Sequence, residues 1–160
     1  MNQLSSYIKR NTIHIFALVL FLCVTVLYCY PIIKGEKINQ SDYKQFLGMS
    51  QEIVDHRTET GQEALWTNSM FGGMPAYQIS VYYPNNILLT IDKFLQLYLP
   101  RPIGIIFLYF LGFYILLLSI KINPHLSILG ALAFGMSSYF FIILEAGHNT
   151  KAHAIAYIAP

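Results

Sequence analysis

An aspartate shortly after a long apolar segment is the first residue whose position suggests chemistry. Asp42 follows the charge-free run 11–33 and opens a stretch with helical periodicity. A carboxylate held at a membrane surface can accept a proton from an acceptor hydroxyl. The dipole of a helix also favours an aspartate in its first turn, with no further role. Asp42 is therefore a candidate catalytic residue, with a helix-terminal aspartate as the alternative.

A second candidate is the run 66–75, Trp-Thr-Asn-Ser-Met-Phe-Gly-Gly-Met-Pro. Glycines allow positive φ angles and close backbone approach. Exposed N–H groups and a side-chain amide could then hold phosphate or sugar oxygens. The alternative is a tight loop that packs on the membrane surface through its aromatic and methionine side chains. The substrate-binding candidates are Trp66, Asn68, Gly72 and Gly73.

The third candidate region begins at Glu145 and includes His148 and Lys151. Ionisable groups at the end of a membrane helix often mark functional sites. Glu145 and His148 have the i, i+3 spacing of a metal pair on a helix, but Gly147 should break the helix and no third ligand is evident. We assign no metal ligands and keep a bound divalent cation as an alternative. Interfacial capping is the alternative for the region, and Lys151 could bind a phosphate or extend its ammonium to the interface.

The composition indicates that these candidates belong to a membrane protein. Of the 160 residues, 55% are hydrophobic and only 11% are charged, whereas a soluble domain has about 25% charged residues. So few charges cannot cover a water-facing surface, which indicates that much of the surface faces lipid. The net charge of +2 forms no basic run, and nucleic acid is excluded as a partner.

Three charge-poor segments predict an all-α membrane protein with transmembrane helices at 12–33, 102–120 and 126–144. The first spans about 33 Å, enough for a hydrocarbon core of about 30 Å. A cleaved signal peptide is the competing interpretation of that segment, but its apolar core is long and no small-residue cleavage site follows. The short turn 121–125 makes the second and third helices an antiparallel hairpin.

Basic residues set the orientation. Lys9 and Arg10 predict a cytoplasmic segment 1–11, and Lys121 predicts a cytoplasmic turn. The loop 34–101 and the segment 145–160 then lie outside, so that Asp42 and Glu145 share one face of the membrane.

The outer loop 34–101 is too long to be a simple connector. Helical spacing predicts an amphipathic helix over 42–56, with Ser41 as its N-cap. Alternation over 77–83 allows a short extended stretch, and the apolar face of 86–99 predicts a helix lying in the membrane interface. Residues 152–160 look like the start of a further helix, so that the chain appears truncated.

These features together resemble a known family. A first span, the loop opening Ile-Asn-Gln-Ser-Asp at 38–42, the run 65–75, a hairpin and Glu-Ala-Gly-His at 145–148 resemble the N-terminal portion of YfhO-like bacterial membrane proteins. The resemblance implies a GT-C type glycosyltransferase. It implies catalytic roles for Asp42 and Glu145, and it places the glycine loop and Lys151 near a lipid-phosphate donor. GT-C enzymes have many more spans than three, so this chain would be an inactive fragment by itself.

The resulting hypothesis is a multi-pass protein of the bacterial cytoplasmic membrane with its N-terminus inside. It would be the N-terminal part of an enzyme that transfers a sugar from a polyprenyl-phosphate donor to an envelope glycan or glycolipid. No cofactor is expected. A non-catalytic membrane scaffold, a transporter subunit or an inactive remnant is the alternative.

Overall fold

The structure, a computed structural model, describes the backbone of residues 2–158 and the side chains of residues 11–158. Residues 1, 159 and 160, which belong to the predicted end segments, lie outside the described part. The predicted all-α class is confirmed, because the elements are mostly helices with one very short pair of strands. The elements are α1 (Asn2–Tyr28), α2 (Tyr30–Ile33), α3 (Ser41–Thr60), β1 (Trp66–Thr67), β2 (Met74–Pro75), the 3-10 helix Ala76–Gln78, α4 (Ile87–Leu95), α5 (Ile103–Ser119), α6 (Pro124–Gly135), α7 (Ser138–Ala146) and α8 (Asn149–Ile158).

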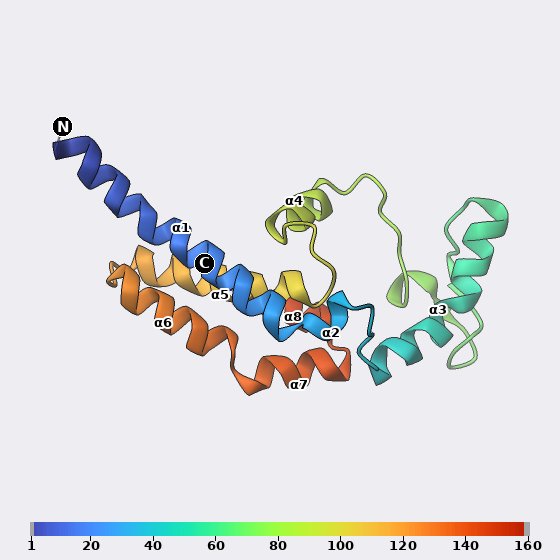
Figure 1. Ribbon diagram of the computed structural model, residues 1–160. Helices are drawn as coiled ribbons and strands as arrows, with labels where there is room; N and C mark the ends of the chain where they lie inside the picture. Colours follow the sequence, from blue (N-terminus) through green and yellow to red (C-terminus); the bar gives the residue numbers. More distant parts are fainter. Residues whose placement is uncertain (1, 159–160) are drawn as a thin grey trace.

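Helix α5 is the centre of the helical bundle. It is apolar on all sides, and α1, α6 and α8 pack against it (Figure 1). Aromatic rings fill the contacts of α5: the ring centre of Phe21 of α1 lies 5.4 Å from that of Phe110 of α5, and the ring of Tyr109 stacks on that of Phe140 of α7 with 4.4 Å between their centres. The hydroxyl of Tyr109 donates to the carbonyl of Ala152, which fixes α8 to α5. The central helix is thus covered by elements from both ends of the chain.

The sequence predicts one helix over 12–33, but the structure breaks this segment before residue 33. Helix α1 ends at Tyr28, and after Cys29 the chain forms the separate turn α2. Pro31 stands at the start of α2. A proline has no N–H to continue the helical hydrogen-bond ladder, and its ring clashes with the preceding turn.

The third predicted span is also interrupted. Helix α6 ends at Gly135 and α7 begins at Ser138, with Ser137 in an extended conformation between them. Gly135 lies directly against the ring of Phe110, so that a side chain at this position would clash. The close approach of α6 to α5 accompanies the break, and no proline marks it in the sequence.

Two helical segments are long and apolar enough to cross a membrane, Asn11–Tyr28 and Pro124–Ala146. Helix α5 is apolar but has only 17 residues, a length of about 26 Å. The segment predicted as 102–120 is therefore shorter than expected, and a third crossing stays a prediction.

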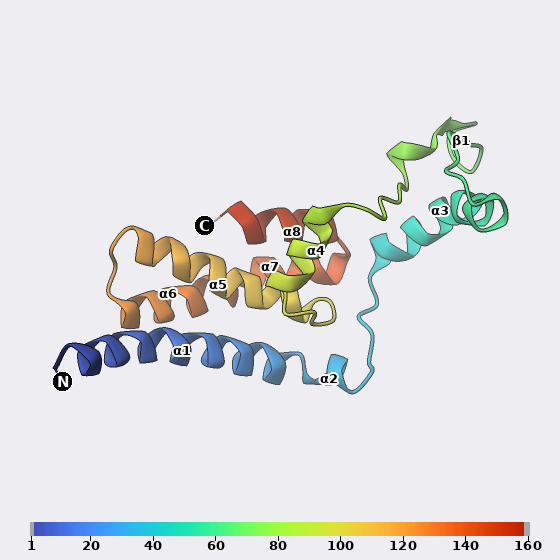
Figure 2. The ribbon, with the colours of Figure 1, turned by 90° about the horizontal axis from the view of Figure 1, so that it is seen from above.

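The bundle has two distinct ends. The N-terminus and the turn between α5 and α6 lie at one end, whereas α2 and the start of α3 lie at the other (Figures 1 and 2). Helix α3 then extends away from the bundle and bears the β1–β2 hairpin at its far end. The predicted amphipathic helix is thus α3, which is longer than expected, and the predicted interfacial helix is α4. Residues 77–83 form no strand.

Candidate functional site

The corner between α7 and α8 is built around Gly147. This glycine has a φ of +101° and ends α7. The N–H of Gly147 donates to the carbonyl of Leu144, and that of His148 donates to Ile143. This is a Schellman-type helix end, which favours glycine because it needs a left-handed backbone. The chain reverses here, and α8 runs back along the bundle.

The start of α3 docks directly on this corner. The side-chain amide of Gln40 donates to the backbone carbonyl of Leu144 and lies within hydrogen-bond distance of the amide of Asn149. A Cβ atom at Gly147 would lie 3.1 Å from the backbone nitrogen of Tyr43 and 3.2 Å from the Cβ of Asp42. The absence of a side chain at Gly147 thus lets α3 approach the corner closely.

This docking pairs Asp42 with His148. The Nε2 atom of His148 lies 2.8 Å from the Oδ2 atom of Asp42, and about half of each side chain stays exposed. The sequence-based hypothesis paired Asp42 with Glu145 instead. Glu145 is exposed in the last turn of α7 and does not line the cavity beside Asp42. The structure therefore brings the predicted residues Asp42, His148 and Lys151 together and leaves Glu145 outside.

A cavity of about 630 Å³ opens beside the Asp42–His148 pair. Two cations line it: Lys151 from α8, whose ammonium lies 5.2 Å from the ring centre of Tyr139, and Arg101 from the loop before α5. The sequence analysis did not single out Arg101. Its position directly before the proline that precedes an apolar helix was the signal available. The remaining lining residues are Tyr43, Phe46, Gly147, Asn149 and Thr150.

The predicted substrate-binding run 66–75 lies elsewhere, at the far end of α3 (Figure 2). It forms the β1–β2 hairpin, in which Trp66 pairs with Pro75 and Thr67 with Met74. Gly73 faces the indole of Trp66, since a Cβ there would lie 2.6 Å from the indole nitrogen. Trp66, Asn68, Gly72 and Gly73 do not line the Asp42 cavity. The run thus forms a hairpin on α3, away from the Asp42–His148 pair.

Glu52 of α3 holds this hairpin in place. Its Oε2 atom accepts hydrogen bonds from the Thr67 hydroxyl at 2.5 Å and from the backbone N–H of Asn68 at 3.0 Å. The hydroxyl of Ser69 donates to the carbonyl of Met49. The hydrogen bond from Thr67 lowers the pKa of Glu52, assisted by the backbone N–H groups and opposed by partial desolvation.

No group of three or more histidine, cysteine, aspartate or glutamate side chains that could hold a metal ion occurs within the part of the chain that the structure describes. No protein family, no curated protein and no solved structure matches this sequence or its fold.

Proposed function

We propose that this chain is the N-terminal section of a membrane glycosyltransferase. The enzyme would move a sugar from a polyprenyl-phosphate carrier to a hydroxyl of an envelope acceptor on the outer face. One observation is the basis of the proposal: a cavity at one end of an apolar bundle joins the carboxylate of Asp42 to the cations Arg101 and Lys151. The choice of a glycosyltransferase among membrane proteins comes from the resemblance to YfhO-like proteins that the sequence analysis expects.

The surface of the bundle supports a membrane location. Only 17% of the segment Asn11–Tyr28 and 33% of Pro124–Ala146 is buried within the bundle. A core helix of a soluble protein would hide most of its apolar surface, whereas these helices leave large side chains exposed, such as Phe16 and Leu129. Contiguous apolar surface of this kind fits lipid or further helices. In the proposal α5 is a third crossing at the centre of the bundle.

The charge distribution supports the orientation. Lys9, Arg10 and Lys121 belong to the end of the bundle that holds the N-terminus and the α5–α6 turn. Basic residues in short segments favour the cytoplasmic side. The Asp42 cavity, at the other end, would then face the outside, where a polyprenyl-phosphate sugar is presented.

The side chains suit transfer to a hydroxyl. Asp42 can accept the proton of the acceptor hydroxyl, while His148 orients its carboxylate. Arg101 and Lys151 add two positive charges to the same cavity, and an arginine matches the geometry of a phosphate group. The proposal thus assigns the base to Asp42, positioning to His148 and phosphate binding to the two cations, without a role for Glu145.

The break between α6 and α7 favours a second candidate, a transporter subunit, because transporters often have broken helices at membrane depth. Its surroundings argue against that function. Gly135 packs on the ring of Phe110, and Phe134 lies 4.9 Å from Phe140. An aromatic environment offers few groups to coordinate an ion or a polar solute. The enzyme is therefore a better explanation of the structure than a transporter subunit.

A transfer assay tests the proposal, with membranes that contain the full-length enzyme of which this chain would be the N-terminal section, and with a radiolabelled polyprenyl-phosphate sugar. Asp42→Asn should reduce transfer by about 10²- to 10⁴-fold, the usual contribution of a positioned base, with unchanged membrane insertion. Asp55→Asn is the matched control, since Asp55 is an exposed aspartate on the same helix that accepts from Gln51. Wild-type transfer by Asp42→Asn would remove this residue from catalysis. No transfer by the full-length wild-type enzyme would favour a non-catalytic scaffold.

A further inference from the structure

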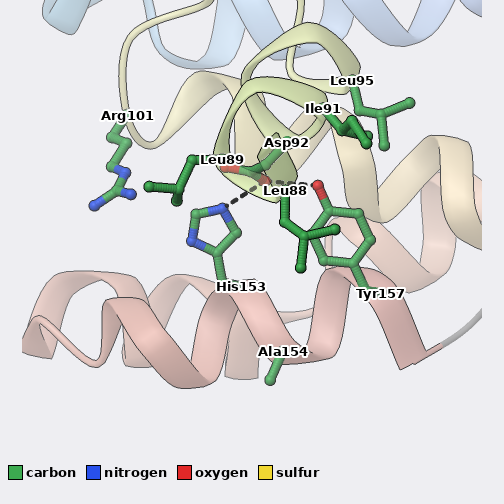
Figure 3. Close-up of a pocket in the computed structure, with 9 residues that line it drawn as sticks. All are labelled: Leu88, Leu89, Ile91, Asp92, Leu95, Arg101, His153, Ala154 and Tyr157. Carbon is green, nitrogen blue, oxygen red and sulfur yellow. Dashed lines mark hydrogen bonds and ion pairs between the residues drawn. The ribbon is translucent and has the colours of Figure 1, made fainter. Parts of the chain in front are cut away.

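A second polar cluster lies between α4 and α8 (Figure 3). The Oδ1 atom of Asp92 accepts hydrogen bonds from the hydroxyl of Tyr157 at 2.6 Å and from the amide of Gln96 at 2.8 Å, and it lies 3.0 Å from the Nε2 atom of His153. The side chains of Asp92 and His153 are only 18% and 20% exposed. Three partners thus converge on one carboxylate oxygen.

This cluster attaches α4 to the bundle. Asp92 joins α4 to α8, and the buried Gln96 lies against α5, where a Cβ at Gly104 would come within 2.8 Å of it. Partial burial alone would raise the pKa of Asp92, but the hydrogen bonds from Tyr157 and Gln96 and the nearby His153 outweigh it and lower that pKa. An ionised Asp92 therefore holds the helix by polar contacts.

The apolar face of α4, in contrast, is open. Ile87, Leu88 and Phe94 are each more than 60% exposed. Beside this face lies a cavity of about 440 Å³, and its wall is mainly aliphatic. Arg101 lines the side of the cavity opposite Tyr157, with Leu89 and His153 between them (Figure 3). The other aliphatic lining residues are Leu88, Ile91, Leu95 and Ala154.

We propose that this cavity binds the hydrocarbon chain of an anionic lipid whose head group contacts Arg101. An aliphatic wall favours a hydrocarbon chain, because burying each methylene group removes apolar surface from water. The carboxylate of Asp92 also lines the cavity, but its Oδ1 atom already accepts hydrogen bonds from Tyr157 and Gln96. The guanidinium of Arg101 at the other side favours a phosphate or carboxylate head group over a neutral one. The site rests on the membrane location in the proposed function and shares Arg101 with the Asp42 cavity, but its aliphatic wall does not depend on sugar transfer at Asp42.

Photolabelling tests this site. The chain is placed in neutral phosphatidylcholine vesicles with hexadecyl phosphate that has a diazirine in its chain, or with the corresponding neutral alcohol. We expect label within residues 88–95 and 153–157, and labelling by the phosphate on the order of tenfold above the alcohol, the effect of one charge-assisted contact. Millimolar inorganic phosphate should not displace the probe, because it lacks the chain.

Variants separate this cavity from the rest of the molecule. Leu89→Gln should reduce labelling at least several-fold. Phe94→Gln, an exposed position of the same helix outside the cavity, should leave it unchanged. Asp42→Asn should also leave it unchanged, even if it abolishes transfer. Should Leu89→Gln lose helicity by circular dichroism, Ala154→Phe fills the cavity from α8 and should block labelling instead.

Several results would overturn the inference. Equal labelling by the phosphate and the alcohol would remove the role of Arg101. Displacement by inorganic phosphate would show an ion site without a chain site. An equal loss in Leu89→Gln and Phe94→Gln would show general membrane contact of α4. A loss in Asp42→Asn would move the lipid to the other cavity.

Discussion

The close approach of α3 to the α7–α8 corner can be tested at Gly147. Replacing it by alanine has two expected costs. A left-handed backbone costs an alanine about 1–2 kcal/mol. The new Cβ would also lie 3.1–3.2 Å from Tyr43, Asp42 and Gln40, closer than the about 3.5–4.0 Å of a relaxed carbon contact. Such overpacking typically costs a further 1–3 kcal/mol, roughly.

Gly61→Ala is the matched control. Gly61 also ends a helix in the left-handed conformation, with a φ of +70°, but no atom lies within 4 Å of a Cβ built there. It should therefore lose only the backbone contribution of about 1–2 kcal/mol. The difference between the two variants measures the steric contribution of the contacts with Gln40, Asp42 and Tyr43.

Two measurements test the predicted difference between Gly147→Ala and Gly61→Ala. The midpoint of unfolding in a denaturing detergent should fall further for Gly147→Ala than for Gly61→Ala. Hydrogen exchange of the backbone amides at 41–46, followed by mass spectrometry, should accelerate only in Gly147→Ala, because the first turn of α3 must move away from the corner. Equal loss of stability in both variants, with unchanged exchange at 41–46, would refute the docking of α3 on Gly147.

Two further predictions concern the hairpin and the bundle. Because the pKa of Glu52 is lowered in the folded chain, its contribution is present above the ordinary value of 4.5 and is lost as the pH falls through the lower folded value. Fluorescence of Trp66, the single tryptophan, should change over that acidic range in the wild type but not in Glu52→Gln; an identical pH response would contradict this role. Gly135→Ala should destabilise the bundle by about 1–3 kcal/mol through overpacking on Phe110, whereas Gly48→Ala, in an open helical position, should stabilise α3 by about 0.5–1 kcal/mol; equal thermal shifts would contradict the packing at Gly135.

Local signals in the sequence were enough to predict most helices. Asn86 caps α4 through its side chain, which accepts from the N–H of Leu88, and the apolar face that follows indicated an interfacial helix. The start of α3 was predicted to within one residue. These features depend on residues close together in the sequence, and the spacing of apolar residues in the sequence indicates them directly.

The candidate site was only partly predictable. Asp42 and His148 were both singled out, but their pairing depends on how closely α3 approaches Gly147, which no local pattern encodes. The position of the hairpin away from Asp42 could not be predicted, because its hydrogen bonds to α3 come from Glu52, which lies outside the glycine run. The break at Ser137 escaped detection because it has no proline and depends on the packing of Gly135 against Phe110.

The central position of α5 has a consequence for the order of assembly during synthesis. One of the helices that cover α5 is α8, which begins thirty residues after α5 ends. When α5 leaves the ribosome, Ala152, whose carbonyl accepts the hydrogen bond of Tyr109, has not yet emerged. One side of α5 therefore stays uncovered during synthesis. It is covered by α8 only after the chain has turned at Gly147 and folded back.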